Sequence, residues 1–381
     1  MPKNHSFTIR AMDTTGGFAD RDFSINVLNT KVNRYLALSG ADVFVSPDLV
    51  NWSKNTGTTT ISGRSGTGVA VASGGGMWVI QHGATNSNYF ISTEDGVFFN
   101  HHNITWEALN IPPEVTRPSG SLICHGMPKY HNGKWWGMFA NNTRTTAFLC
   151  NTVDFNTWHT VASFDDSSSG GYTTLHFDGD TVSFHVGWFA SVTGYFMIDI
   201  SDDSYKGKLA HTLITLASAV RTNASSVYGP FKIHDKWCMW IGKTGTSASM
   251  IITSDDLVTW EAATIANGSL HYGATRCVRD LVNVGGKYFL TFTNISASTA
   301  SYFGLLSTKD GRAWHYDSIT GSVNASQQVS LFQNKNDLYC IAGANIHKSA
   351  DLGETGWGAV IRNDLFPTGT FGIVNNVQER K

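Results

Sequence analysis

The acidic side chains are the first residues to consider for chemistry, because reactions on sugars commonly use carboxylates. A glycosidase needs two of them roughly 5–10 Å apart, one on each side of the scissile bond. The chain has only six glutamates, and several of its aspartates recur in one turn motif. Outside that motif, the strand-like candidates are Asp178, Asp180 and Asp280. These three aspartates are weak evidence for a catalytic pair of carboxylates, so we assign no catalytic residue and do not expect an enzyme.

Fourteen histidines raise the question of a metal site. His101 and His102 are adjacent in sequence, and adjacent side chains of a strand point to opposite faces, so the two cannot readily share an ion. His82, His125 and His185 fall near the ends of strand-like runs. Buried or solvated histidines are much commoner than ligating ones. We therefore expect no metal and no cofactor.

A heptad that ends in tryptophan recurs along the chain. Residues 254–260 read Ser-Asp-Asp-Leu-Val-Thr-Trp, and residues 46–52 are nearly the same. The gaps between the aspartates of successive copies run from 41 to 59 residues, and strand-like repeats of roughly 40–50 residues indicate propeller blades. The aspartates of the copies are Asp48, Asp95, Asp154, Asp203, Asp256, Asp310 and Asp351, and the clearest tryptophans are Trp52, Trp158, Trp260 and Trp314.

These aspartates suit a structural role. An aspartate in a tight turn accepts hydrogen bonds from backbone N–H groups one to three residues later, and so clamps two strands together. The tryptophan that follows offers a large apolar surface for packing between sheets. The heptad resembles the Asp-box (BNR repeat), Ser-x-Asp-x-Gly-x-Thr-Trp, of sialidase-like propellers. In that family the box joins the third and fourth strands of a blade, on the face away from the ligand.

The resemblance implies the fold but not the sialidase reaction. The early Arg-Ile-Pro motif of the family is absent, and no glutamate stands opposite an inner-strand tyrosine that could act as nucleophile. We predict an all-β chain, with a seven-bladed Asp-box β-propeller over residues 30–381 and six blades as the alternative. The first unit lacks its inner strand, and a strand at 370–375 would close the ring and remove the last exposed sheet edges.

The resemblance also places the ligand face, which such propellers build from the loops between second and third strands. Here these loops are rich in Ser, Thr, Asn and Gly, which suits hydrogen bonding to sugar hydroxyls, and an aromatic side chain could stack on a sugar ring. The alternative is that they are solvated hairpin loops without a ligand. The binding candidates on this face are Trp188, Arg144, Lys243, Tyr302, His125 and Arg279.

Residues 1–29 are predicted to form a separate β-hairpin. Apolar and polar residues alternate over 7–11 and over 23–27, and the turn residues 13–17 lie between them. The segment resembles the end of the Ig-like (cadherin-like) domains that recur in phage tail and bacterial surface proteins, truncated here. A two-stranded hairpin alone is marginally stable, so we expect it to act as an attachment arm that packs on another chain.

Composition excludes several classes of protein. Charged residues make up 15% of the chain and the net charge is −2, which argues against nucleic-acid binding. The sequence contains no run of eighteen apolar residues, so we expect no membrane insertion. The N-terminus lacks the apolar segment of a signal peptide. The five cysteines form no CxxC pair, so buried free thiols are expected.

An Ig-like ending joined to Asp-box repeats in a charge-poor chain resembles a bacteriophage virion protein of the tail or head surface, made in the host cytoplasm. The resemblance implies a non-enzymatic structural or adhesive component in a symmetric assembly. Its partners would be other virion proteins, through the hairpin, and a bacterial surface polysaccharide or receptor. One alternative is a lectin-like receptor-binding protein that recognises a host glycan. The other is a polysaccharide-degrading glycosidase.

Overall fold

The computed structural model divides the chain into two compact units, Met1–Asn33 and Arg34–Lys381, and each is described by itself. The residues that the structure describes are 3–12, 14–27, 35–39, 42–49, 51–55, 71–82, 88–143, 145–165, 175–186, 193–214, 224–243, 249–266, 276–294, 302–318, 329–334, 337–342, 345–349 and 360–362. The predicted closing strand at 370–375 and the predicted turn aspartate Asp351 lie outside them.

The first unit contains a β-hairpin. Strand β1 (Lys3–Met12) pairs with β2 (Phe18–Val27) in antiparallel register over ten residue pairs. Gly16 lies in the connecting turn with a φ of 85°, which glycine adopts without steric cost. The hairpin lies where the alternating pattern placed it, and its resemblance to an Ig-like domain remains a prediction.

The second unit is a succession of sheets along the chain. The first sheets consist of β3 (Tyr35–Ser39), β4 (Asp42–Ser46) and β5 (Ser53–Lys54); then β6 (Val71–Gly74), β7 (Met77–His82), β8 (Tyr89–Thr93) and β9 (Asn100–Asn103); then β10 (Leu109–Asn110), β11 (Leu122–Cys124), β12 (Lys129–His131), β13 (Lys134–Asn141), β14 (Thr146–Thr152), β15 (Trp158–Asp165) and β19 (Lys208–Leu209).

The next sheet, here the β16–β20 sheet, holds β16 (His176–Asp178), β17 (Thr181–Val186), β18 (Thr193–Asp199) and β20 (Thr212–Ile214). It is followed by β21 (Ala224–Ile233), β22 (Lys236–Lys243), β23 (Met250–Ser254) and β24 (Glu261–Ala262); by β25 (Thr264–Ala266), β26 (Arg276–Val284), β27 (Lys287–Asn294), β28 (Tyr302–Thr308) and β29 (Ala313–Ser318); and by β30 (Val329–Asn334), β31 (Asp337–Ala342), β32 (Asn345–Ser349) and β33 (Val360–Arg362).

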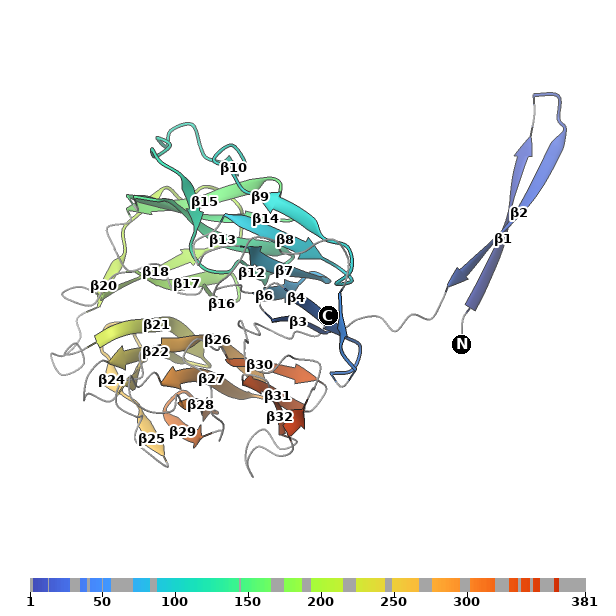
Figure 1. Ribbon diagram of the computed structural model, residues 1–381. Coiled ribbons are helices and arrows are strands. Elements are labelled where there is room, and N and C mark those ends of the chain that lie inside the picture. The colour runs from blue at the N-terminus through green and yellow to red at the C-terminus, as the bar shows by residue number, and fades with distance from the viewer. Residues whose placement is uncertain are drawn as a thin grey trace. The chain divides into compact units, whose positions relative to one another are not determined.

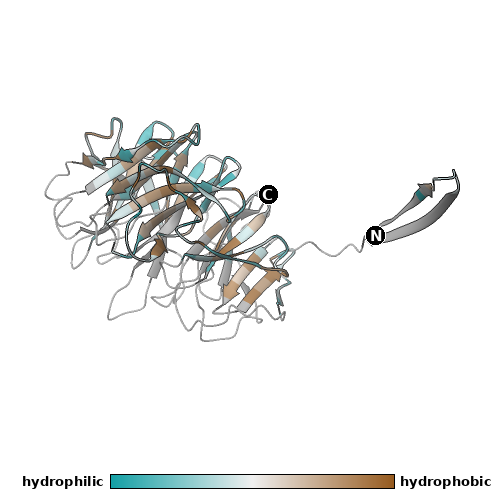
Figure 2. Cartoon of the chain, turned by 90° about the horizontal axis from the view of Figure 1, so that it is seen from above, coloured by the Kyte–Doolittle hydropathy of each residue, from teal (hydrophilic) through white to brown (hydrophobic). Residues whose placement is uncertain are grey.

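The arrangement is that of a β-propeller. Neighbouring sheets contact one another through strands near the start of each sheet: β6 contacts β12, β16 contacts β21, β21 contacts β26, and β26 contacts β30. Figure 1 shows the sheets of this unit set around a common centre. The middle strands β14 and β22 are buried along almost their whole length, and Figure 2 shows hydrophobic stretches among the strands of this unit. No helix in the described part of the chain is long and apolar enough to cross a membrane.

The ring is less regular than predicted. Five sheets have the four or five strands of a single blade. The β3–β5 sheet has three described strands. The β10–β15 sheet has seven, because the short strands β10 and β19 both add in parallel to β15 and cover its outer edge. The prediction of seven blades, or six, is therefore wrong: five blades of regular size are present in the described residues.

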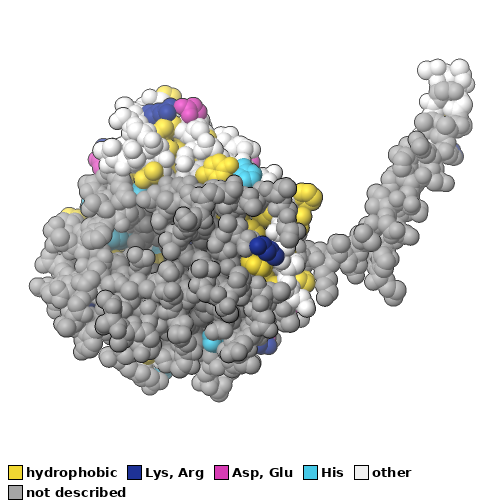
Figure 3. All heavy atoms as spheres, viewed as in Figure 1, with side chains coloured by type: hydrophobic (Ala, Val, Ile, Leu, Met, Phe, Trp, Pro, Cys, Tyr) yellow, Lys and Arg dark blue, Asp and Glu magenta, His cyan; other side chains and the backbone are white. Residues whose placement is uncertain are grey.

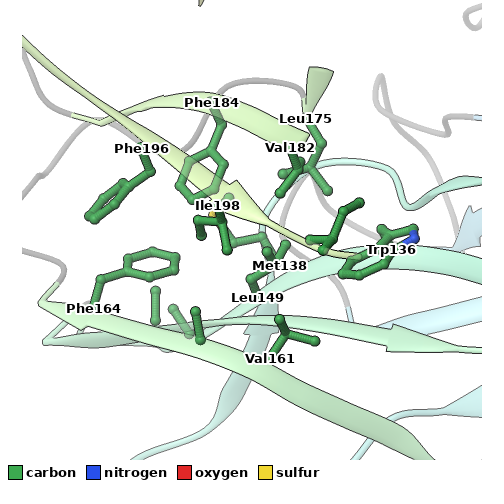
Figure 4. Packing of buried hydrophobic residues seen from close by; sticks show 14 residues of the cluster. Trp136, Met138, Leu149, Val161, Phe164, Leu175, Val182, Phe184, Phe196 and Ile198 are labelled. Carbon is green, nitrogen blue, oxygen red and sulfur yellow. The ribbon is translucent and has the colours of Figure 1, made fainter. Parts of the chain in front are cut away.

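One inter-sheet core is a large cluster of buried hydrophobic side chains. It lies between the β10–β15 sheet and the β16–β20 sheet, and Figure 4 shows its side chains pointing toward one another from the two sheets. Burying one such side chain stabilises the fold by roughly 1.5–3 kcal/mol. The largest members are Trp136, Met138, Leu149 and Phe164 from one sheet and Leu175, Val182, Phe184, Phe196 and Ile198 from the other side.

Five turns, each between two consecutive strands of one sheet, share one hydrogen-bonding scheme. In the turn at residues 254–260, the carboxylate of Asp256 accepts the N–H groups of Val258 and Thr259 at 2.9 and 2.8 Å, and the hydroxyl of Ser254 accepts the N–H of Leu257 at 2.8 Å. The Trp260 indole N–H donates to the Leu257 carbonyl. Turns around Asp48, Asp95, Asp154 and Asp310 repeat the carboxylate and hydroxyl bonds.

The residue after each turn aspartate has a positive φ, between 62° and 77°. It is glycine only at Gly96 and Gly311, where an added Cβ would lie 2.3 Å from Val45 and 3.2 Å from the Cys238 sulfur. The other three turns carry a leucine or phenylalanine in this left-handed conformation, which costs about 1–2 kcal/mol. At two of them the side chain is buried, and this burial offsets the strain.

Asp203 differs from the prediction. Its carboxylate accepts bonds from Lys134 and Asn151 of the preceding sheet, and no bond to the N–H of a following residue is recorded for it. It therefore joins two sheets instead of clamping a turn.

Candidate functional site

The structure separates the predicted binding residues. Trp188 and Arg144 lie outside the described residues, while Tyr302 and Arg279 lie on β28 and β26 with their side chains undescribed. His125, after β11, and Lys243, at the end of β22, are buried, with 6% and 5% of their surface exposed. Their part in binding remains a prediction.

The predicted carboxylates do not converge in the described part of the chain. Asp178 forms an ion pair with Lys232 at 2.8 Å, and Asp180 accepts a hydrogen bond from the Asn132 amide at 3.3 Å. Both lie at the turn between β16 and β17, where they tie this sheet to its neighbours. The Asp280 side chain is undescribed.

The loop after β13 is the predicted ligand loop whose side chains are best described. Its polar groups mostly bond to one another: the Asn141 amide donates to the Ser119 carbonyl at 3.0 Å and to the Thr145 hydroxyl at 2.9 Å, and its oxygen accepts the Thr145 N–H at 2.8 Å. Beside it, Arg117 lies over the Trp106 ring at 5.6 Å. On the face in Figure 3, the coloured charged side chains are scattered and form no broad patch.

A different group of polar residues lies buried between the β16–β20 and β21–β24 sheets. His185 on β17 stands directly opposite Tyr195 on β18, and directly opposite residues of an antiparallel pair point to the same face. Tyr195 packs in a cluster with Val227 and Ile241 of the next sheet. Both side chains therefore face that sheet. They are 2% and 6% exposed.

Lys243 belongs to the same interface. Alternation along β22 places it on the face of Ile241, two residues away, which is about 7 Å along a strand. Its N–H donates to the Ser249 hydroxyl at 3.1 Å, and the Ser249 side chain is buried as well. Val186 and Lys243 end their strands on the side of the predicted ligand loops. We refer to His185, Tyr195 and Lys243 together as the buried cluster.

Burial shifts all three pKa values toward the uncharged forms. It lowers the pKa of His185 to about 3 and lowers the pKa of Lys243. It raises the pKa of Tyr195 more than the hydrogen bond with Thr212 lowers it. His185 is therefore uncharged at neutral pH. Grouped shifted pKa values occur at functional sites, although buried structural networks also produce them.

Sequence reasoning found part of this cluster. Lys243 was a binding candidate, and His185 was noted near a strand end, but Tyr195 was missed. Alternation over 181–186 and 193–199 could have placed His185 and Tyr195 on one face of the hairpin. The local sequence does not indicate which neighbouring sheet packs against that face.

The described residues contain no group of three His, Cys, Asp or Glu side chains placed to hold a metal ion. Three thiols, of Cys124, Cys150 and Cys238, are buried and free. Burial raises their pKa values, to about 12 for Cys150, so they are poor nucleophiles.

Comparison with known proteins identifies the fold. No protein-family model and no curated protein matches the chain. Among solved structures, a quinoprotein alcohol dehydrogenase-like protein from Bacteroides thetaiotaomicron has a TM-score of 0.53 at 10% identity, over 100% of this chain and 86% of the other. A thermostable family-43 glycoside hydrolase has a TM-score of 0.40 at 13% identity, over 67% and 93%.

The propeller domain of the trilobed protease from Pyrococcus furiosus has a TM-score of 0.40 at 9% identity, over 74% of this chain and 82% of the other. Further similar structures are a family-62 arabinofuranosidase and prolyl endopeptidases. The expectation of a non-enzymatic chain is therefore contradicted: the structures that share this arrangement include glycoside hydrolases and peptidases. At these identities the likeness concerns the fold, and the site must supply the function.

Proposed function

We propose that the second unit binds and cleaves a polysaccharide at the face where β17 and β22 end. The observation that supports this is the buried cluster: a histidine, a tyrosine and a lysine lie in one inter-sheet interface beside the predicted ligand loops. Burying such groups lowers stability, so their presence favours a chemical role.

A polysaccharide fits the neighbouring surface. The described loop of this face exposes Thr143 and Thr145, whose hydroxyl groups can hydrogen-bond to sugars, and the buried Asn141 amide holds the loop in place. Trp106, beside this loop, is buried in the core and bonds through its indole N–H to the Gly120 carbonyl at 2.9 Å, so it supports the loop from beneath. A polymer can use such a surface for binding while one of its linkages reaches the reactive groups.

The test uses the full chain with a set of bacterial surface polysaccharides. Binding is measured with labelled protein, and polymer length is followed by size-exclusion chromatography in the same samples. We expect binding accompanied by shortening. Binding with intact polymer would leave only the lectin-like alternative, and no binding of any polymer would refute the proposal.

We also propose that the hairpin attaches the propeller to other proteins of a phage virion. A two-stranded sheet leaves edges that another chain can pair with, and the hairpin is a compact unit of its own. Deleting residues 1–27 should leave the thermal transition of the propeller unchanged and abolish incorporation into particles. Normal incorporation of the shortened chain would contradict this role.

A further inference from the structure

The loop after β13 carries two exposed hydroxyl groups that one buried amide holds close together. The Asn141 side chain is 1% exposed, whereas Thr143 and Thr145 are exposed residues. The Asn141 Nδ2 atom lies 2.5 Å from the Thr143 hydroxyl oxygen and 2.9 Å from the Thr145 hydroxyl oxygen. Because both oxygens contact the same nitrogen atom, their separation cannot exceed these two distances taken together. One small ligand group can therefore reach both hydroxyls.

The direction of these hydrogen bonds decides what the two hydroxyls can bind. The Asn141 amide oxygen accepts the Thr145 N–H at 2.8 Å, and this bond fixes which way round the amide lies. The amide nitrogen can only donate, so each threonine oxygen accepts from it and keeps its own hydrogen. Neither hydroxyl donates to another group in the part of the chain that the structure describes. Both O–H groups are thus available to a ligand as donors.

The segment before β11 holds this loop in place. The Asn141 amide also donates to the Ser119 carbonyl at 3.0 Å, so its two N–H groups are shared among three oxygens. The Asn142 N–H donates to the Ser121 carbonyl at 2.8 Å. Gly120 lies so close that an added Cβ would be 2.3 Å from the Asn142 side-chain oxygen. A binding group that is already ordered loses less conformational entropy when a ligand binds.

We propose that Thr143 and Thr145 together bind an acidic group of the polysaccharide, a carboxylate or a sulfate, by donating both hydroxyl hydrogens to its oxygens. This inference rests on the proposed function and names the class of substrate. It concerns binding at the exposed loop and assigns no catalytic residue.

An ionised acid group matches a pair of donors better than a neutral sugar hydroxyl does. Its oxygens only accept hydrogen bonds, whereas a sugar hydroxyl also carries a hydrogen that needs an acceptor. At Thr143 and Thr145, the Asn141 amide already occupies part of the accepting capacity. Hydrogen bonds to an ionised acceptor are also about twice as strong as those between neutral groups. The loop should therefore select acidic polymers.

Three polymers test the substrate class. The full-length protein is titrated with polygalacturonate, with dextran sulfate and with neutral dextran at physiological ionic strength, and the dissociation constants are compared. We expect at least one acidic polymer to bind about tenfold more tightly than dextran. Preference for polygalacturonate would identify a carboxylate as the bound group, and preference for dextran sulfate would identify a sulfate.

Other results would overturn the inference. Binding of dextran as tight as that of both acidic polymers would remove the acidic group and leave the proposed function in place. No binding of any polysaccharide, the bacterial polymers included, would overturn the inference and the proposed function together.

Variants of the loop test the two hydroxyls. Thr143→Val and Thr145→Val each remove one O–H donor from an exposed side chain and keep its shape, so each should weaken binding of the acidic polymer by about tenfold. Thr143→Ser retains the hydroxyl and should bind as the unchanged protein does. The matched control is Thr157→Val, because Thr157 is exposed in the turn at the opposite end of β14.

Near-ultraviolet circular dichroism checks that each variant is folded. Unchanged binding by both folded valine variants of the loop would overturn the inference. Arg144 lies between the two threonines in the sequence, outside the described residues. Loss of binding in Arg144→Ala with none in either valine variant would also overturn it, because recognition would then depend on the charge of the arginine.

Discussion

The two faces of the β16–β20 sheet differ in kind, although they come from the same strands. Phe184 faces the β10–β15 sheet in a cluster of apolar side chains. Ser183, one residue earlier, faces the β21–β24 sheet and donates to the Pro230 carbonyl at 2.8 Å. His176 lies on this second face, with its ring centroid 4.7 Å from that of Tyr228, and so does His185.

The difference separates stability from chemistry. The apolar face gains free energy from every side chain that it buries. The second face is stabilised less, because burying a histidine, a tyrosine and a lysine costs free energy. Because the apolar face stabilises the sheet, the other face can contain buried polar groups that lower stability. Substitutions on the two faces should therefore change the free energy of unfolding by different amounts.

The largest effect is expected on the apolar face. Phe184→Ala removes a fully buried aromatic ring that lies 5.5 Å from Phe164 and 5.2 Å from Phe196 between ring centroids. The lost burial and the cavity together should lower the free energy of unfolding by about 3–5 kcal/mol. Denaturation in urea measures it. A loss below about 1 kcal/mol would mean that this face does not carry the stability assigned to it.

Ser183→Ala should cost less, on the other face. The substitution leaves the buried Pro230 carbonyl without its recorded donor, which lowers the free energy of unfolding by about 1–3 kcal/mol. Urea denaturation beside Phe184→Ala gives the direct comparison between neighbouring residues. A larger loss for Ser183→Ala than for Phe184→Ala would reverse the assignment of the two faces.

Lys243→Met should change stability little at neutral pH, and in the stabilising direction. Burial lowers the pKa of Lys243 below its ordinary value of 10.5, so the unfolded chain holds this proton more tightly than the folded one. Between the two pKa values the stability of the unchanged protein rises with pH. Methionine carries no proton, so the variant should be slightly more stable at neutral pH, by less than the loss expected for Ser183→Ala.

This gain should shrink as the pH approaches 10.5, and urea denaturation at several pH values measures it. A variant that is strongly destabilised at neutral pH would show instead that the lysine ammonium stabilises the fold.

Local features of the structure could be predicted from sequence. The turn around Asp256 uses a hydroxyl, a carboxylate and N–H groups that lie within five residues of one another, so the heptad is enough to predict it. The hairpin follows from alternation and a glycine turn in the same way. These interactions do not depend on where the rest of the chain goes.

Long-range features could not be predicted. Asp203 fits the same local pattern, yet its partners Lys134 and Asn151 are 69 and 52 residues away. The parallel addition of β10 and β19 to β15 likewise joins distant segments and makes this sheet larger than a regular blade. The buried cluster depends on which sheet faces His185, and that is decided by packing of whole sheets.

The smallest effect is expected at the turn end of the polar face. Asp178 and Lys232 are 2.8 Å apart, with side chains 49% and 33% exposed, and Lys232 also lies over the Trp237 ring at 5.4 Å. Such a partly exposed pair contributes about 0–1 kcal/mol. Asp178→Ala should therefore lower stability by less than 1 kcal/mol, with the difference vanishing at high salt.

The same substitution should leave polymer cleavage unchanged, because Asp178 is remote from the buried cluster. Loss of cleavage in the folded variant would instead make Asp178 one of the two carboxylates of a glycosidase.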